Sequence, residues 1–194
     1  MPALIDLPTT AAWAHVDART GFEVAFFQHL GAGWRLEGAT AAVEDGEAWV
    51  VRYRIEVDER WVTRRAEVTS QSALGVRHAR LEADGAGRWL VGGDRAPALD
   101  GCLDVDLEAS AMTNLLPERR LALEVGERAG APAAYVRALD LEVEPLPQEY
   151  VRLPDAGRHR RYRYSCPTFA LACDLEVDAA GLVVSYPGIA RRVR

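Results

Sequence analysis

Apolar and polar residues alternate along this chain with a period of two, and this pattern limits the folds open to it. From Trp49 to Val57 every second side chain is apolar, while Arg52, Arg54 and Glu56 fall between them. Successive side chains of a strand point to opposite faces of a sheet, so the run predicts a strand with one buried face. Similar runs return at residues 60–69, 119–125, 135–143 and 169–177.

Short turn signals separate these runs, including Asp45-Gly46, Asp84-Gly85 and Gly92-Gly93. Many short strands broken by such turns are typical of antiparallel sandwiches, rolls and barrels. We therefore predict an all-β, mostly antiparallel fold with about ten to twelve strands. One short helix or turn is expected near residues 113–118, and another near residues 22–30.

Length, composition and charge exclude several classes of protein. The 194 residues fit a single domain, and 49% of them are hydrophobic, which supplies a core without disulfides or metal. The three cysteines form no Cys-x-x-Cys pair and are expected as small buried apolar residues. A net charge of −6 argues against nucleic-acid binding, which depends on basic side chains. We predict no metal, no cofactor and no nucleic-acid partner.

The N-terminal sequence bears on location. Residues 1–6 show no basic stretch followed by the long apolar run of a signal peptide. No stretch approaches the roughly 18 consecutive apolar residues of a membrane-spanning helix. We therefore expect a cytoplasmic protein without a membrane span.

A weak internal repeat suggests a duplication. Leu81–Gly87 and Leu175–Gly181 match at their Leu, Glu, Asp, Ala and Gly positions, nearly half the chain apart. One interpretation is a fold of two related halves, at about residues 33–100 and 101–190. The alternative is two ordinary hairpin turns in a chain rich in alanine and glycine.

Residues 99–121 carry the densest polar chemistry. On a strand, Asp104 and Asp106 share one face with Cys102 and Glu108, and the apolar residues between them face the core. Acids on one face repel each other unless they meet water or cations. The local cations are two consecutive arginines that follow the Thr113-Asn114 turn.

This central string, from Asp100 to Leu121, resembles the signature of the bacterial putative glycolipid-binding domain family. The supporting matches are Gly87-Arg88-Trp89, Gln148-Glu149-Tyr150 with Arg152, Tyr162-Arg163-Tyr164, Phe169, Val177-Asp178, Gly181-Leu182-Val183 and Tyr186-Pro187-Gly188. The resemblance spans about residues 33–190. It implies a spiral β-roll or open half-barrel of two similar halves, akin to lipid carriers, and a glycolipid-like ligand. The family has no settled catalytic residues, so the resemblance assigns none here.

Our first functional hypothesis is therefore a non-catalytic binding protein for a glycolipid-like or other amphipathic molecule. A curved sheet offers an apolar groove for chains, and arginine offers a planar fork to an anionic head group. The candidate ligand-binding residues are Trp49, Tyr53, Trp61, Arg65, Trp89, Asp104, Asp106, Asn114, Arg119, Arg120, Tyr164 and Tyr186, with Trp34 and Phe169 as further groove candidates. The competing interpretation is that the aromatic residues are plain core.

Two other functions stay open. An enzyme would use the carboxylates of Asp100, Asp104 and Asp106 for acid–base work, with Arg119 and Arg120, on a sugar or lipid substrate. An assembly protein would form a homodimer through exposed sheet edges.

Overall fold

Fourteen strands form one continuous antiparallel sheet in this computed structural model, which describes residues 6–193. The strand order is β10-β13-β14-β15-β16-β17-β1-β2-β3-β4-β5-β6-β7-β8. The bounds in chain order are β1 Thr10–His15, β2 Thr20–Leu30, β3 Gly33–Glu44, β4 Glu47–Val57, β5 Thr63–Ser72, β6 Gly75–Ala83, β7 Trp89–Val91, β8 Asp94–Arg95, β10 Arg128–Gly130, β13 Glu149–Ala156, β14 His159–Cys166, β15 Leu171–Val177, β16 Val183–Tyr186 and β17 Ala190–Arg192.

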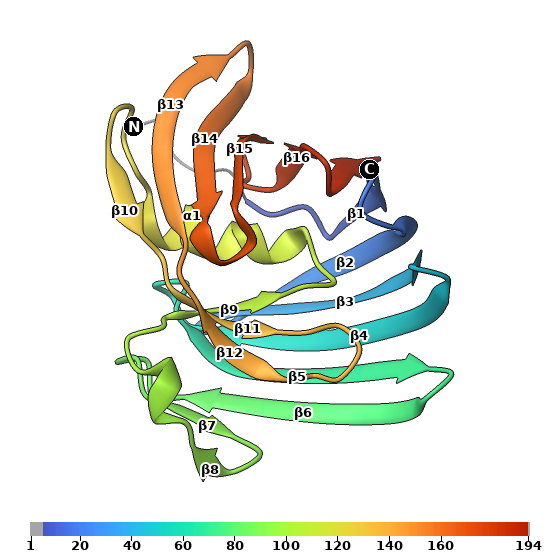
Figure 1. Cartoon of the computed structure of the whole chain (residues 1–194). Coiled ribbons are helices and arrows are strands. Elements are labelled where there is room, and N and C mark those ends of the chain that lie inside the picture. The colour runs from blue at the N-terminus through green and yellow to red at the C-terminus, as the bar shows by residue number, and fades with distance from the viewer. Residues whose placement is uncertain (1–5, 194) are drawn as a thin grey trace.

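A smaller sheet and one helix lie inside the curve of the large sheet (Figure 1). The small sheet has the order β12-β11-β9, with β9 (Asp104–Leu107) parallel to β11 (Ala133–Val136) and β12 (Val143–Leu146) antiparallel to it. The helix is α1 (Leu115–Leu121), and the 3-10 turns are η1 (Pro97–Leu99), η2 (Met112–Asn114) and η3 (Pro167–Phe169). The large sheet stays open, because its edge strands β8 and β10 do not pair with each other.

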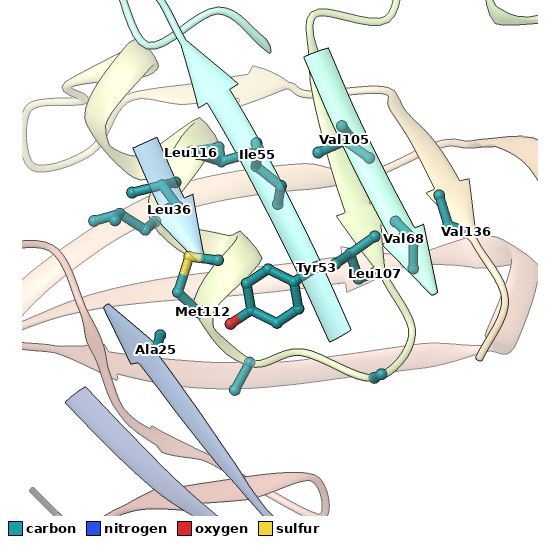
Figure 2. Close-up of a cluster of buried hydrophobic side chains, with 14 of the residues drawn as sticks. Ala25, Leu36, Tyr53, Ile55, Val68, Val105, Leu107, Met112, Leu116 and Val136 are labelled. Atoms are coloured by element: carbon teal, nitrogen blue, oxygen red, sulfur yellow. The ribbon is translucent and has the colours of Figure 1, made fainter. Parts of the chain in front are cut away.

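The inner face of the N-terminal strands packs against these central elements. Figure 2 shows Tyr53 and Ile55 of β4 beside Val105 and Leu107 of β9. Ile55 and Val105 are fully buried. Full burial of such a side chain stabilises a fold by about 1.5–3 kcal/mol. The alternation within β4 therefore does what its pattern predicts: it places one face against the core.

The buried side chains divide into two clusters with different aromatic residues. The first, which we call the tryptophan cluster, contains Trp13, Trp49, Trp61 and Trp89, with Trp34 packed against it. The second, the tyrosine cluster, contains Tyr135, Tyr150, Tyr162, Tyr164 and Tyr186. All five tryptophans of the chain thus belong to one region, and five of its six tyrosines to the other. A tyrosine brings a hydroxyl that needs a partner when buried, so the second region has to be more polar.

The predicted fold class is confirmed: the fold is all-β and mostly antiparallel, with an open sheet and a short helix where residues 113–118 indicate one. The number of strands was underestimated, because the residues described contain seventeen strands, several only two to four residues long. Such short strands are too brief to show a clear alternation.

Three local predictions are wrong. Residues 135–143 are not one strand, because β11 ends at Val136 and β12 begins at Val143. Residues 22–30 form part of strand β2 instead of a helix. Both faces of β2 carry apolar side chains, because Phe22 and Phe26 are exposed on its outer face. The sequence therefore lacks the alternation of apolar and polar residues that indicates a strand. Residues 119–125 are not a strand, because residues 119–121 complete helix α1 and Ala122 ends it in the left-handed region at φ 46°.

The repeated segments Leu81–Gly87 and Leu175–Gly181 both run from the end of a strand into the same aspartate-centred turn. Asp84 Oδ1 accepts the amide hydrogens two and four residues later, at 2.7 and 3.0 Å. Asp178 Oδ1 does the same at 2.9 and 3.0 Å. The sequence match therefore marks a shared turn geometry.

A third copy of this turn lies at Asp58, whose Oδ1 accepts the amides of Arg60 and Val62 at 2.9 and 3.0 Å. Its fourth position is Trp61 at φ 64°, where the other two copies have glycine. A bulky residue with a positive φ is unusual, and here stacking on Trp34 accompanies it, with ring centroids 5.9 Å apart. Because the turn occurs three times, it does not by itself indicate a duplication, and the two related halves stay a prediction.

Candidate polar pocket in the tyrosine cluster

Strand β9 carries two carboxylates into the interior, and they have different partners. Asp104 accepts hydrogen bonds from Nε and Nη2 of Arg120 at 3.0 and 2.6 Å. Burial raises the pKa of Asp104, and the hydrogen bonds and charge of Arg120 oppose this rise. The predicted pairing of this acid with an arginine after the turn is present, and it fastens α1 to the small sheet.

Asp106 is held by neutral donors only. Its Oδ1 accepts from the Thr113 hydroxyl at 2.7 Å, and its Oδ2 accepts from Nε2 of Gln148 at 2.5 Å. Gln148 Nε2 also lies 3.1 Å from the Tyr164 hydroxyl. Burial raises the pKa of Asp106, while the bonds from Thr113 and Gln148 lower it. Between residues 6 and 193, no arginine or histidine forms an ion pair with this carboxylate.

Asp106 borders a cavity of about 200 Å³, which we call the tyrosine pocket. The lining residues come from the small sheet, the loop and turn after β9, the β1–β2 connection, and the region from β14 to the β16–β17 connection. They are Arg19, Asp106, Leu107, Glu108, Ser110, Asn114, Tyr135, Leu146, Tyr164, Phe169, Leu171, Tyr186 and Ile189. Other, more open hollows lie along strands β2 to β5 and at β6 to β8.

Two aromatic pairs form part of the pocket wall. Tyr164 and Tyr186 meet edge to face with ring centroids 5.9 Å apart, and Tyr135 and Phe169 meet at a tilt, 5.5 Å apart. Burial raises the pKa of both Tyr164 and Tyr186, so their hydroxyls stay protonated and able to donate. Phe169 is 45% exposed, which leaves an apolar ring accessible beside the pocket.

Asn114 is the only asparagine of the chain, and its side chain forms two hydrogen bonds. Its Nδ2 donates to the carbonyl of Ala111 at 3.3 Å, which closes its own turn. Its Oδ1 accepts from the Tyr150 hydroxyl at 2.9 Å, and the residue lines the pocket. The side chain therefore links η2 to strand β13 and contributes polar lining to the pocket.

Behind the pocket lies a second buried carboxylate, Glu23 of β2. It accepts from the Tyr53 hydroxyl at 2.7 Å, from the Ala111 amide at 2.8 Å and from the Ser110 hydroxyl. Burial raises the pKa of Glu23 to about 6, and these hydrogen bonds oppose the rise. Ser110 lines the pocket, so Glu23 holds in place the loop that forms one wall.

Arg19 is the one guanidinium among the pocket-lining residues, and it already contacts several other groups. Its Nη1 donates to the carbonyl of Glu108 at 3.2 Å, and its Nε lies 3.5 Å from Glu44 Oε2. Its Cζ lies 5.3 Å from the centre of the Trp49 ring. Glu108 in turn accepts the Ala138 amide hydrogen with Oε2 at 2.7 Å. The charge of Arg19 is thus matched by Glu44 outside the pocket.

Of the twelve residues predicted to bind ligand, four meet at this pocket: Asp106, Asn114, Tyr164 and Tyr186. Trp49, Tyr53, Trp61 and Trp89 are buried in the tryptophan cluster, Asp104 and Arg120 pair with each other, and Arg65 pairs with Glu67. Arg119 donates to the carbonyl of Ala180 at 2.9 Å and lies over the Trp61 ring at 5.1 Å.

Sequence reasoning missed several residues of the pocket and its support, including Arg19, Glu23, Glu108, Ser110, Tyr135 and Gln148. Glu23 left a usable signal, because it falls in register with Ala25 and Phe27 on the inner face of β2. An acid in a core register needs buried donors, which is a reason to suspect a polar site. Ser110 and Gln148 lie in loops and left no such signal.

The three carboxylates of the enzymatic hypothesis have different partners and do not meet at one site. Asp100 forms a two-pronged ion pair with Arg95 at 2.8 and 2.9 Å on the surface, and Asp104 is bound to Arg120. Only Asp106 lines the pocket. Within the described part of the chain, no group of three or more His, Cys, Asp or Glu side chains is placed to hold a metal ion.

The fold and this site define a class: an open, mostly antiparallel β-sheet protein wrapped around a small sheet, with an acidic tyrosine-lined pocket. The chain belongs to the family described as "Putative glycolipid-binding", whose model matches residues 10–192. No curated protein matches the chain. In residues 6–193, no helix has the length and apolar character needed to cross a membrane.

Two solved structures share the fold. A DUF1089 family protein from Pseudomonas aeruginosa is 34% identical, with a TM-score of 0.76 over 98% of this chain and 96% of that one. A β-barrel-like protein from Brucella abortus, of the domain of unknown function DUF1849, is 12% identical, with a TM-score of 0.52 over 98% and 96%. The second likeness concerns the fold alone.

Proposed function

We propose that this protein binds the polar head of a glycolipid-like, amphipathic molecule in the tyrosine pocket. The observation that carries the proposal is the wall itself, where aromatic rings stand beside Asp106, Asn114 and Ser110. Flat rings pack against the apolar faces of a sugar, and the acids and amide bond its hydroxyls. The family description agrees with such a ligand.

The size of the pocket limits what enters it. About 200 Å³ lies below the roughly 300–1,000 Å³ of sites that enclose a whole drug-sized ligand. A head group of one ring matches this volume, while an acyl chain has to lie outside. Exposed Phe169 and the neighbouring Leu171 and Ile189 offer apolar surface for the start of that chain.

The test uses n-octyl glucoside below its micelle concentration as the probe, followed by saturation-transfer NMR. We expect transfer to the sugar and the first alkyl protons, and native mass spectrometry should find lipid on the freshly purified protein. Tyr164→Phe should weaken binding by about three- to tenfold, the effect of one lost hydrogen bond.

Tyr162→Phe is the matched control, because Tyr162 is buried on the same strand two residues away but bonds to Glu118 outside the pocket. It should leave affinity unchanged. A protein that carries no lipid and gives no transfer from octyl glucoside would refute the proposal.

Two finer predictions accompany this function. We propose a bacterial cytoplasmic location and no nucleic-acid partner, in keeping with the net charge of −6.

We also propose that any homodimer through the large sheet's edges is weak. Its edge strands β8 and β10 have two and three residues, which gives few backbone hydrogen bonds. Light scattering at two concentrations checks this, and a stable dimer would contradict it.

A further inference from the structure

The acids of this interior differ in whether a cation accompanies them. Asp104 is paired with Arg120, and Glu118 with Arg160 at 2.8 Å. Asp106 and Glu23 have neutral donors alone. Of these two, Glu23 is completely shielded from solvent, whereas Asp106 keeps partial exposure and lines the pocket. Asp106 is therefore a carboxylate without a cation that a ligand can reach.

The surroundings of Asp106 add to its negative charge. Glu108 lines the same pocket, and no arginine of the described chain forms an ion pair with it. Arg19 is matched by Glu44, and Asp104 is matched by Arg120. Glu23 lies one hydrogen bond behind Ser110. The pocket wall thus carries a net negative charge, which favours a cation and disfavours a phosphate or sulfate.

The rings point to the same ligand chemistry. Tyr135, Tyr164, Tyr186 and Phe169 all line the pocket, and the negative face of an aromatic ring attracts an ammonium group. Aromatic rings combined with a carboxylate are a recurrent way to bind organic cations. An uncharged sugar would use the rings but would leave the charge of Asp106 unmatched.

We infer that the head group taken by this pocket carries an ammonium group beside its hydroxyls, as in an amino sugar. This inference rests on the proposed function, because it names the chemistry of the ligand at the same site. Asp106 is the partner of the ammonium, Glu108 adds to the attraction, and Asn114 and Ser110 remain for the hydroxyls.

The experiment compares glucosamine with glucose and N-acetylglucosamine at about pH 7, where an aliphatic amine is largely protonated. These probes differ at one substituent: an ammonium, a hydroxyl or a neutral amide. Saturation-transfer titrations with the full chain should give glucosamine a dissociation constant about tenfold lower than the other two, as a charge-assisted hydrogen bond provides.

Asp106→Asn should lower the affinity for glucosamine about tenfold more than the affinity for glucose, so that the preference for the amine is lost. Glu108 lies just after the end of β9, where the fold accommodates a substitution more easily than at Asp106. Glu108→Gln should reduce the preference for glucosamine about threefold. The control is Asp174→Asn, since Asp174 pairs with Arg161 and Arg163 away from the pocket. It should change neither affinity.

Equal affinity for the three sugars would overturn the inference, as would an undiminished preference for glucosamine in both pocket variants. Tighter binding of O-phosphoethanolamine than of glucosamine would also overturn it, because the acidic wall should repel a phosphate. If octyl glucoside binds without any preference for the amine, the proposed function stands and only this inference fails. If octyl glucoside and all the sugars fail to bind, both fail.

Discussion

The tryptophan cluster and the tyrosine cluster belong to one continuous sheet, yet they are built for different tasks. In the first, large apolar side chains fill the space between β2 to β6 and the central elements, and the polar atoms of Trp13 and Trp89 bond to backbone carbonyls. In the second, hydroxyl-bearing rings surround a small cavity with a carboxylate that lacks a cation. The difference indicates that aromatic content alone does not identify a binding site. The polar atoms of the rings, and what they bond to, are the informative part.

The largest expected effect concerns the tryptophan cluster. Trp89 is fully buried, and its Nε1 donates to the carbonyl of Cys102 at 2.9 Å. Trp89→Ala should lower the free energy of unfolding by about 4 kcal/mol, because it opens a large cavity. Tyr186→Phe, in the other cluster, should cost less than about 1 kcal/mol. Urea denaturation measures both, and similar losses for the two variants would break the distinction between the clusters.

The Asp104–Arg120 pair fastens α1 to β9, and its loss should have the next largest effect on stability. Arg120→Ala leaves a buried carboxylate without its partner, which costs about 3 kcal/mol at neutral pH. The loss should shrink in acid, because a protonated Asp104 no longer needs a cation. Urea denaturation at pH 7 and pH 5 tests this, and a loss independent of pH would show that packing, not charge, is responsible.

The raised pKa of Glu23 predicts that the free energy of unfolding depends on pH. Its pKa of about 6 in the fold exceeds the ordinary value of 4.5, so the native state binds the proton more tightly than the unfolded state. The contribution of Glu23 to the free energy of unfolding is therefore complete below pH 4.5. It is lost as the pH rises through 6, by about 2 kcal/mol in total.

The contribution of Glu23 is isolated by subtracting the pH profile of Glu23→Gln, which cannot titrate at this position. Between pH 4.5 and 7.5, the wild type should lose about 2 kcal/mol relative to this variant. Chemical denaturation at several pH values measures the difference. Parallel profiles would mean that the carboxylate keeps an ordinary pKa inside the fold.

The smallest effect is expected on the outer face of the sheet. Arg54 pairs with Glu37 at 2.5 Å, but both side chains are exposed. Arg54→Ala should change the free energy of unfolding by less than about 1 kcal/mol, because water and salt screen such pairs. A loss as large as that of Arg120→Ala would mean that the outer face also holds the sheet together.

The sequence by itself determined the fold class and much of the local structure. Alternation in β4 and β15 predicts strands with one buried face, because the period of two is a property of the extended chain. The aspartate turns and the helix after Thr113 follow equally from local chemistry. Alternation gave a wrong prediction at residues 119–125. The first three of these residues belong to helix α1, because a run this short fits a helix as well as a strand.

Only the tertiary structure decided which polar residues meet. Asp106, Gln148 and Tyr164 come from three separate segments, and their bonds depend on how the small sheet lies against the large one. The sequence treats Asp104 and Asp106 as equivalent, two residues apart on one face. The fold gives Arg120 to the first and leaves the second facing the pocket, because charge pairing depends on distances in space that no local pattern encodes.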